Sequence, residues 1–143
     1  MHPITVYPES DGIKKFFSTK YDEVNIRNGP GKNYYVIGKH FKKGLPVLVV
    51  NEFDGWKRII NFLGKEGWVS NSQLSKKRFG ITKKKTFLKS FPKSDSTNQF
   101  LLGKHLNFKI IKCLKEWCKT KIKKTNGWIR KDSFWGVFKD EEF

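Results

Sequence analysis

The sequence predicts an all-β protein built from two tandem small β-barrels. Short runs of alternating apolar and polar residues are separated by turns rich in glycine and proline, a pattern typical of short strands. No stretch shows the sustained periodicity of a helix, and motifs of the first half recur in the second. A fixed internal period indicates duplicated units, here of about 60 residues each.

The expected strands of the first unit follow one another closely. Residues 24–27 alternate apolar and polar side chains, and residues 45–50 form the longest apolar run. Asp54 and Gly55 predict a tight hairpin, because such a turn needs the positive φ angles that glycine supplies. Residues 56–60 return from this hairpin, and residues 67–69 close the unit.

Four segments of the first unit have counterparts in the second. The paired segments are 26–30 with 88–92, 38–40 with 103–105, 49–56 with 110–117, and 67–69 with 127–129. We therefore predict a flexible lead, a first barrel, a basic linker, a second barrel and an acidic tail, at residues 1–15, 16–75, 76–85, 86–138 and 139–143. An inter-domain strand is the alternative for the basic residues 76–85.

The chain is strongly basic, with a formal charge of +17 and a pI near 10.0. This charge favours anionic surroundings such as nucleic acid, lipid headgroups or an acidic wall polymer. However, lysine supplies 26 of the 30 basic residues and alanine is absent, which is typical of an AT-rich coding sequence. We therefore interpret most of the charge as compositional.

The location of the protein stays open at the level of composition. No apolar run approaches the roughly 20 residues of a membrane span. The N-terminus has no hydrophobic signal core, so that the chain is either cytoplasmic or a mature form whose signal peptide has been removed.

Three motifs together carry a family resemblance. They are N-I-R-N-G-P-G at residues 25–31, the block G-x-P-x-x-V-x-x-E-x-D-G-W-x-x-I at residues 44–59, and G-W-V at residues 67–69. The chain resembles the bacterial SH3-like domain over residues 16–138, in a tandem two-copy form. The resemblance implies a small barrel of five to six strands per copy, extracytoplasmic placement, and binding to cell-wall peptide or to a partner protein.

The second copy departs from the family pattern in its first loop. Phe91 and Lys93 stand where the first copy has Gly29 and Gly31. We expect the backbone of this second loop to differ from that of the first, and a ligand role there is correspondingly in doubt.

The first loop and its neighbours are the candidate binding site. Gly-rich phosphate loops lead into a helix N-terminus, whereas a strand follows Gly31, so this loop is expected to turn a barrel corner. The family resemblance implies that the loop lies beside a shallow groove where peptide ligands dock. Groove aromatics grip extended peptides at low entropic cost. The expected ligand-binding residues are Arg27, Asn28, Tyr34, Tyr35, Trp56 and Trp68.

Each of these assignments has a structural alternative. The tryptophans, including Trp117 and Trp128 of the second copy, are equally expected to close the barrel cores. Arg27 is expected either to meet a ligand carboxylate or to pair with Glu23 or Glu52 on the surface.

Cys113 and Cys118 match Glu52 and Lys57 in the repeat, on the two arms of one hairpin. The alignment places the two cysteines across from one another, so that a disulfide is the expected arrangement and a reduced pair the alternative. An oxidised pair would favour a secreted or periplasmic protein. The five-residue spacing and the lack of a second cysteine pair argue against zinc.

No catalytic constellation is present in the sequence. His40 and His105 fall at equivalent repeat positions, and neither accompanies a nucleophile in a recognisable spacing. We expect a non-enzymatic binding module of the cell envelope, without cofactor or metal, that binds peptidoglycan peptide or an envelope protein. A periplasmic or secreted location is expected, with a cytoplasmic one not excluded. The alternative is a nucleic-acid-binding barrel protein that uses its basic surface.

Overall fold

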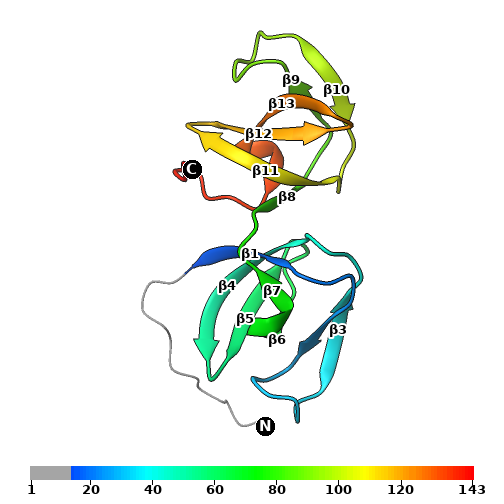
Figure 1. The fold of residues 1–143 in the computed structure, drawn as a ribbon, viewed down its shortest axis with the longest axis vertical. Helices are drawn as coiled ribbons and strands as arrows, with labels where there is room; N and C mark the ends of the chain where they lie inside the picture. The colour runs from blue at the N-terminus through cyan, green and yellow to red at the C-terminus, as the bar shows by residue number, and fades with distance from the viewer. Residues whose placement is uncertain (1–13) are drawn as a thin grey trace.

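The structure, a computed structural model, describes residues 14–143, so the predicted lead lies almost wholly outside the described part. Two antiparallel sheets of seven strands each form two units, which lie one above the other in Figure 1. We call the unit of β1 to β7 the first module and the unit of β8 to β14 the second module. The predicted fold class is confirmed. No helix among the described residues is long and apolar enough to cross a membrane.

The first module begins in the described chain at β1 and ends at β7. Its strands are β1 (Lys15–Thr19), β2 (Val24–Arg27), β3 (Val36–His40), β4 (Pro46–Phe53), β5 (Trp56–Asn61), β6 (Glu66–Ser70) and β7 (Leu74–Ser75). They pair in the order β3-β2-β6-β5-β4-β1-β7, and a 3-10 turn (Asn71–Gln73) precedes β7. Asp54 and Gly55 have φ angles of 48° and 80°, as the predicted hairpin requires.

The second module repeats this topology. Its strands are β8 (Phe79–Thr82), β9 (Thr86–Lys89), β10 (Asn98–Leu102), β11 (Asn107–Leu114), β12 (Trp117–Ile122), β13 (Thr125–Arg130) and β14 (Phe134–Trp135), with a 3-10 turn (Lys131–Ser133) before β14. The order is β10-β9-β13-β12-β11-β8-β14. Strand β8 falls within the basic segment 76–85, for which a linker and an inter-domain strand were the two alternatives. Only residues 76–78 join β7 to β8.

Each module encloses its own core. The first core comprises Val24, Ile26, Val47, Val49, Ile59, Val69 and Leu74, and the second comprises Leu88, Leu102, Phe108, Ile110, Cys113, Cys118, Ile129 and Phe134. Side chains alternate along a strand, so residues next to these core positions project to the outside of the sheet. Trp68 precedes the core residue Val69, and it lies on this outer face.

Buried threonines hold the same turn in both modules. Thr19 Oγ1 donates to Lys42 O at 2.7 Å and accepts the Leu45 N–H at 2.9 Å. Thr82 Oγ1 makes the corresponding two bonds at 2.6 and 2.7 Å. The sequence analysis missed this pair, although Thr-Lys occurs at the end of both β1 and β8.

The two histidines are not equivalent, which corrects the repeat alignment. His40 is buried at the end of β3, where the second module has Leu102 at the end of β10. His105 lies in a turn with φ 62°, where the first module has Gly44 with φ 84°. The N–H groups of His105 and Gly44 each donate to the backbone carbonyl of the buried threonine of their own module.

Aromatic side chains pack between the modules. Phe16 on β1 points away from the first core and is 7% exposed. Its ring centroid lies 5.0 Å from that of Trp135 in an edge-on arrangement and 4.8 Å from that of Phe138. The Asn107 side chain adds a hydrogen bond of 2.8 Å to Gly44 O. The modules therefore form one packed unit rather than two separately tethered barrels.

Arg78, in the connection between β7 and β8, lies at the centre of this interface. Its guanidinium forms a two-point ion pair with Glu141, with one bond of 2.8 Å, and donates to Gly136 O at 2.9 Å. It also stacks over Phe16 and Phe143, at 5.7 and 4.8 Å from the ring centroids. A planar guanidinium can make all these contacts at once, whereas a lysine ammonium cannot.

The charge on Glu141 depends on this arginine. Burial alone would raise the pKa of the carboxyl. Hydrogen bonds from Arg78 and the Phe138 N–H, with the charges of Arg78 and Lys131, hold the pKa below its usual value instead. A depressed folded-state pKa stabilises the fold at pH values above the unfolded-state pKa, and this contribution is lost as the pH falls through the folded-state value.

The predicted acidic tail is part of the second module. Phe143 exchanges two backbone hydrogen bonds with Cys113 on β11, at 2.8 and 3.2 Å. The buried Lys131 donates to the carbonyls of Lys139 and Glu141 at 3.1 and 2.6 Å. These contacts hold residues 139–143 against β11 and beside Arg78.

A disulfide joins Cys113 to Cys118 across the β11–β12 hairpin. These residues are cross-strand partners, as Glu52 and Lys57 are in the β4–β5 hairpin. In the first module this place holds an ion pair of 2.7 Å instead. One hairpin position is thus bridged covalently in one module and electrostatically in the other.

Replacing Arg78 by alanine is expected to destabilise the protein by about 2–3 kcal/mol, because it leaves Glu141 half-buried without its cation. The measurement is urea unfolding at neutral pH. The difference from the wild type should shrink as the pH falls below 4.5, the usual pKa of the Glu141 carboxyl. Arg58→Ala is the control, because the Arg58–Glu66 pair is exposed and contributes under about 1 kcal/mol. Equal losses in the two variants would contradict the central role of Arg78.

Replacing both Cys113 and Cys118 by alanine is expected to cost about 1–2 kcal/mol, since the closed loop is short. Thermal unfolding of the oxidised wild type and the double variant measures this difference. The matched change in the first module, Glu52→Gln with Lys57→Gln, should cost less than about 1 kcal/mol. A double cysteine variant as stable as the wild type would show that the bond adds nothing to the hairpin.

Candidate functional site

The loop between β2 and β3 is closed by its own backbone. The Asn28 N–H donates to Tyr35 O at 3.0 Å, the Gly31 N–H to Gly29 O at 3.0 Å, and the Tyr34 N–H to Gly31 O at 3.2 Å. The next element is the strand β3, so no helix N-terminus is there to receive a phosphate. The loop turns a corner of the barrel.

The glycines of this loop make room for Tyr34. A Cβ atom placed on Gly29 would overlap the Tyr34 ring, and one on Gly31 would lie 3.3 Å from it. Neither glycine adopts a positive φ angle. The N-G-P-G motif therefore reflects close packing of an aromatic ring rather than an unusual backbone conformation.

The loop of the second module has the same backbone. Residues 90–97 make the three equivalent hydrogen bonds at 2.9, 2.8 and 3.1 Å. The expectation that Phe91 and Lys93 change the backbone is therefore wrong. Ser96 stands in place of Tyr34, which leaves the space that Phe91 needs, and the Phe91 side chain is 65% exposed.

The Arg27 side chain forms two hydrogen bonds to the backbone of the first loop. Its Nη1 donates to Lys32 O at 3.2 Å and to Tyr34 O at 3.0 Å. Neither predicted carboxylate partner meets it: Glu23 pairs with Lys39, and Glu52 pairs with Lys57. Arg27 thus orders the loop while remaining half-buried at the edge of a surface hollow.

Two hollows flank the loop and divide the predicted residues. Arg27 and Trp56 share a hollow of about 410 Å³, which we call the Trp56 hollow. Its lining is Glu23, Asn25, Arg27, Lys32, Trp56, Ser70, Ser72 and Gln73. A second hollow of about 420 Å³, the Tyr34 hollow, is lined by Asn28, Tyr34, Ile37, Arg58, Glu66, Gly67 and Trp68.

The six predicted residues therefore do not line one groove. Tyr35 lines neither hollow and is 80% exposed. Arg58 and Glu66, which pair at 3.1 Å in the Tyr34 hollow, were missed by the sequence analysis. The alternation of side chains along a strand could have identified them. Arg58 stands two residues after Trp56 and Glu66 two residues before Trp68, so all four side chains project from the same face of the sheet.

The predicted tryptophans belong to neither core cluster, although Trp68 and Trp117 are buried. Trp56 is half-buried, and Trp68 is 3% exposed although it stands on the outer face, where it is the cross-strand partner of both Arg27 and Arg58. The expectation that the tryptophans close the barrel cores is not met, because cross-strand partners project on the same side of a sheet. On the outer face of the first module, Trp56 and Trp68 lie among the polar side chains of Arg27 and Arg58.

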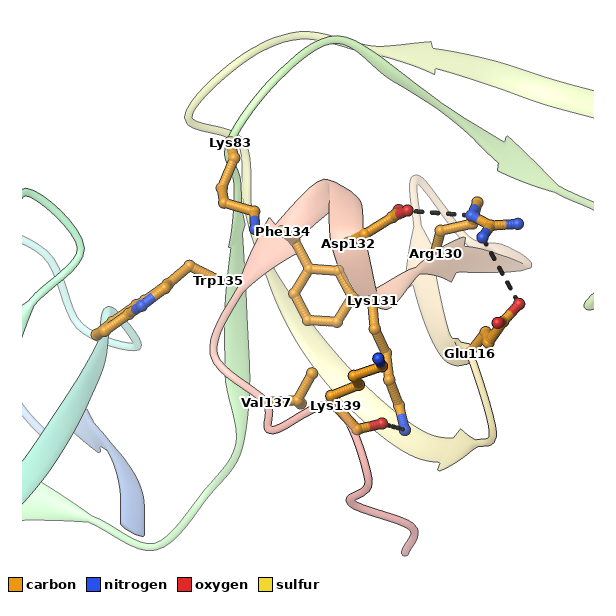
Figure 2. Close-up of a pocket in the computed structure, with 9 residues that line it drawn as sticks. All are labelled: Lys83, Glu116, Arg130, Lys131, Asp132, Phe134, Trp135, Val137 and Lys139. Atoms are coloured by element: carbon orange, nitrogen blue, oxygen red, sulfur yellow. Dashed lines mark hydrogen bonds and ion pairs between the residues drawn. The ribbon is translucent and has the colours of Figure 1, made fainter. Parts of the chain in front are cut away.

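The second module has a hollow of its own, of about 330 Å³, at the end of β13 and around β14 (Figure 2). Figure 2 shows Phe134 at its centre, with the Arg130 guanidinium paired to Asp132 at 3.4 Å and to Glu116 at 3.6 Å. Lys131 reaches down to the Lys139 carbonyl. The arginine and this lysine are thus engaged within the module.

The described residues offer little for catalysis. They contain no group of three or more His, Cys, Asp or Glu side chains that would hold a metal ion. Both cysteines are joined in the disulfide, so neither is a thiolate nucleophile. Burial lowers the pKa of His40, which keeps this histidine neutral at physiological pH.

Substitutions at Gly29 and Tyr34 test whether the two residues pack against each other as the structure shows. Gly29→Ala is expected to cost about 1–3 kcal/mol because its Cβ overlaps the Tyr34 ring. The second module has Ser96 in place of Tyr34. In a variant that already carries Tyr34→Ser, Gly29→Ala should therefore cost little stability. Gly38→Ala is the control, since nothing lies within 4 Å of its Cβ position. Thermal unfolding of the four variants measures the coupling, and additive losses would contradict the packing.

Comparison with known proteins gives the following. A family profile described as bacterial SH3 domain matches residues 20–76 and 92–136. Among solved structures, NlpC2 from Trichomonas vaginalis is 13% identical with a TM-score of 0.41, and the match covers 92% of this chain and 51% of that one. NlpC1 from the same organism is 11% identical with a TM-score of 0.38, covering 85% and 45%. The chain thus spans about half the length of these proteins.

No curated protein sequence matches the chain. The two segments of the family match fall on the two modules, and together they account for more than half of the sequence. The chain therefore belongs to the bacterial SH3 domain family and carries two copies of the domain.

Proposed function

We propose that this protein is a non-catalytic binding module of the bacterial cell envelope, and that its first module binds peptidoglycan peptide. The observation that carries the proposal is the pair of hollows on either side of the Arg27-supported loop. An extended peptide that crosses the loop would meet an aromatic floor on both sides, with Trp56 in one hollow and Tyr34 in the other. Members of this family are generally binding modules rather than enzymes, which supports the proposal.

Charge within the two hollows fits a peptide that carries both signs. Each hollow contains a carboxylate and at least one cation: Glu23 and Arg27 in the Trp56 hollow, Glu66 and Arg58 in the Tyr34 hollow. Peptides of the cell wall bear free amino and carboxyl groups, so paired charges of this kind offer partners for both. An envelope protein segment of similar chemistry is the alternative ligand.

A periplasmic or secreted location is part of the proposal. Family members are typically extracellular or associated with the envelope. The disulfide supports this location, because such bonds persist in oxidising compartments and are rare in the cytosol.

Co-sedimentation with purified peptidoglycan sacculi, in low and in high salt, tests the proposal. The wild type should remain bound in high salt, and Arg27→Ala with Tyr34→Ala should weaken binding by roughly tenfold or more. The matched control is Lys89→Ala with Phe91→Ala, which alters the equivalent loop of the second module. Unchanged binding in the Arg27→Ala/Tyr34→Ala variant, or wild-type binding that disappears in high salt, would contradict a peptide site formed by the Trp56 and Tyr34 hollows.

A further inference from the structure

Strands β9, β13, β12 and β11 of the second module carry a row of lysines on their outer face. Lys89 is the cross-strand partner of Trp128, Trp128 of Lys119, and Lys119 of Lys112. Cross-strand partners project from the same side of a sheet, and Lys121 follows Lys119 on that side by the two-residue alternation. We call Lys89, Lys112, Lys119 and Lys121, which surround Trp128, the lysine face.

The lysine face has no counter-charge. None of its four lysines forms an ion pair with a residue in the part of the chain that the structure describes. Lys112 and Lys121 are exposed, and Lys89 and Lys119 are half-buried. Lys89 Nζ also donates to Ser96 O at 3.4 Å, as Arg27 does to Tyr34 O in the first module. Like charges on neighbouring strands repel one another, so this arrangement costs stability in the free protein. An anion bound across the row would remove the repulsion.

The first module shows that the fold does not require these charges. Its equivalent positions hold two cations, Arg27 and Arg58, and one carboxylate, Glu66, which pairs with Arg58 at 3.1 Å. In the second module Asn126 replaces that carboxylate, and Lys112 and Lys121 replace the uncharged Asn51 and Ile60 of the first, as the matching strand registers show. The same scaffold thus carries two cations and one carboxylate in one copy, and four cations with no carboxylate at these positions in the other.

The aromatic rings of the lysine face indicate the kind of anion. Lys112 lies over the Trp128 ring at 5.9 Å, Lys89 over Phe87 at 5.8 Å, and Arg130 over Trp117 at 5.4 Å. Proteins that bind single-stranded nucleic acid stack bases on exposed ring faces. Here a cation lies over one face of each ring, so a base that stacks on that face would have to displace the cation. This favours a ligand recognised through its charges.

We propose that the lysine face binds a linear polyanion whose charged groups are phosphates and which carries no stacking bases. Lysine ammonium groups suit this ligand, because each is a mobile point charge that contacts phosphate without a fixed geometry. The proposed site lies on the second module and is distinct from the peptide groove of the first. It is independent of that function and does not rest on it.

The test uses the full chain and two probes: a short inorganic polyphosphate and an oligo-dT with the same number of phosphates. Fluorescence anisotropy measures affinity over a range of salt concentrations. The variant Lys112→Gln/Lys119→Gln/Lys121→Gln should bind polyphosphate roughly 10- to 100-fold more weakly at low salt. Its plot of log affinity against log salt should also be shallower by about two to three ion equivalents.

The control variant removes the same charge elsewhere. Lys42→Gln/Lys65→Gln/Lys76→Gln changes three exposed lysines of the first module and its connection, and should weaken binding by less than about threefold. Asn126→Glu is a second probe of the face, because it restores the carboxylate that the first module has. This change should weaken polyphosphate binding without removing any side chain that packs in the core.

The outcomes separate the interpretations. Selective loss in the lysine-face triple variant, with polyphosphate bound at least as tightly as oligo-dT, supports the proposal. Equal losses in the two triple variants would show that net charge alone drives binding, and would overturn it. Tighter binding of oligo-dT through the same lysines would overturn the base-free ligand and point to nucleic acid. Peptidoglycan retention in high salt should be the same in both triple variants, so failure here is distinguishable from failure of the proposed groove.

Discussion

The guanidinium of Arg78 makes one folded unit out of two small barrels. A barrel of about 60 residues buries too little surface to be more than marginally stable by itself. Arg78 lies in the short connection and binds Glu141 and Gly136 of the second module, while its flat face covers Phe16 of the first. This single side chain therefore ties the connection and the C-terminal segment to the aromatic contact between the modules. The Phe16 contacts with Trp135 and Phe138, and the hydrogen bond from Asn107 to Gly44 O, complete the interface around it.

Duplication preserved the backbone of the two modules while side chains were exchanged in compensating pairs. The glycine and tyrosine of the first loop become phenylalanine and serine in the second, and the backbone hydrogen bonds stay the same. The Glu52–Lys57 ion pair becomes a disulfide at the same register of the same hairpin. In the loop, a larger residue at position 29 requires a smaller one at position 34, because a Cβ on Gly29 would overlap the Tyr34 ring. In the hairpin, a disulfide requires cysteine at both positions. Such pairs are difficult to recognise when each position is compared alone.

The predictable parts of this structure are those fixed by local chemistry. Alternation located the strands, and Asp54-Gly55 located a hairpin because positive φ angles favour glycine. The Gly-Trp motifs mark equivalent positions because a Cβ on Gly67 or Gly127 would overlap Ile26 or Leu88 of the adjoining strand. Long-range packing was not predictable. The lysines around β8 left a linker and a strand as alternatives for residues 76–85, and the side on which the tryptophans lie depends on which strands become neighbours.

The two outer faces differ in the quantity that most directly determines their ligands, which is the balance of charge. In the first module Arg58 pairs with Glu66 at 3.1 Å, and Arg27 donates to two backbone carbonyls, so each cation lies beside a partner of opposite or partial negative charge. In the second module the corresponding row keeps its positive charge, and a lysine or arginine lies over each of its three aromatic rings. Because the two modules pack against each other, the distance and orientation between their outer faces are fixed. Under the two proposals, a single chain would contact a peptide with one copy and a charged polymer with the other. The joint attachment would then be tighter than either contact alone, because the second encounter is intramolecular.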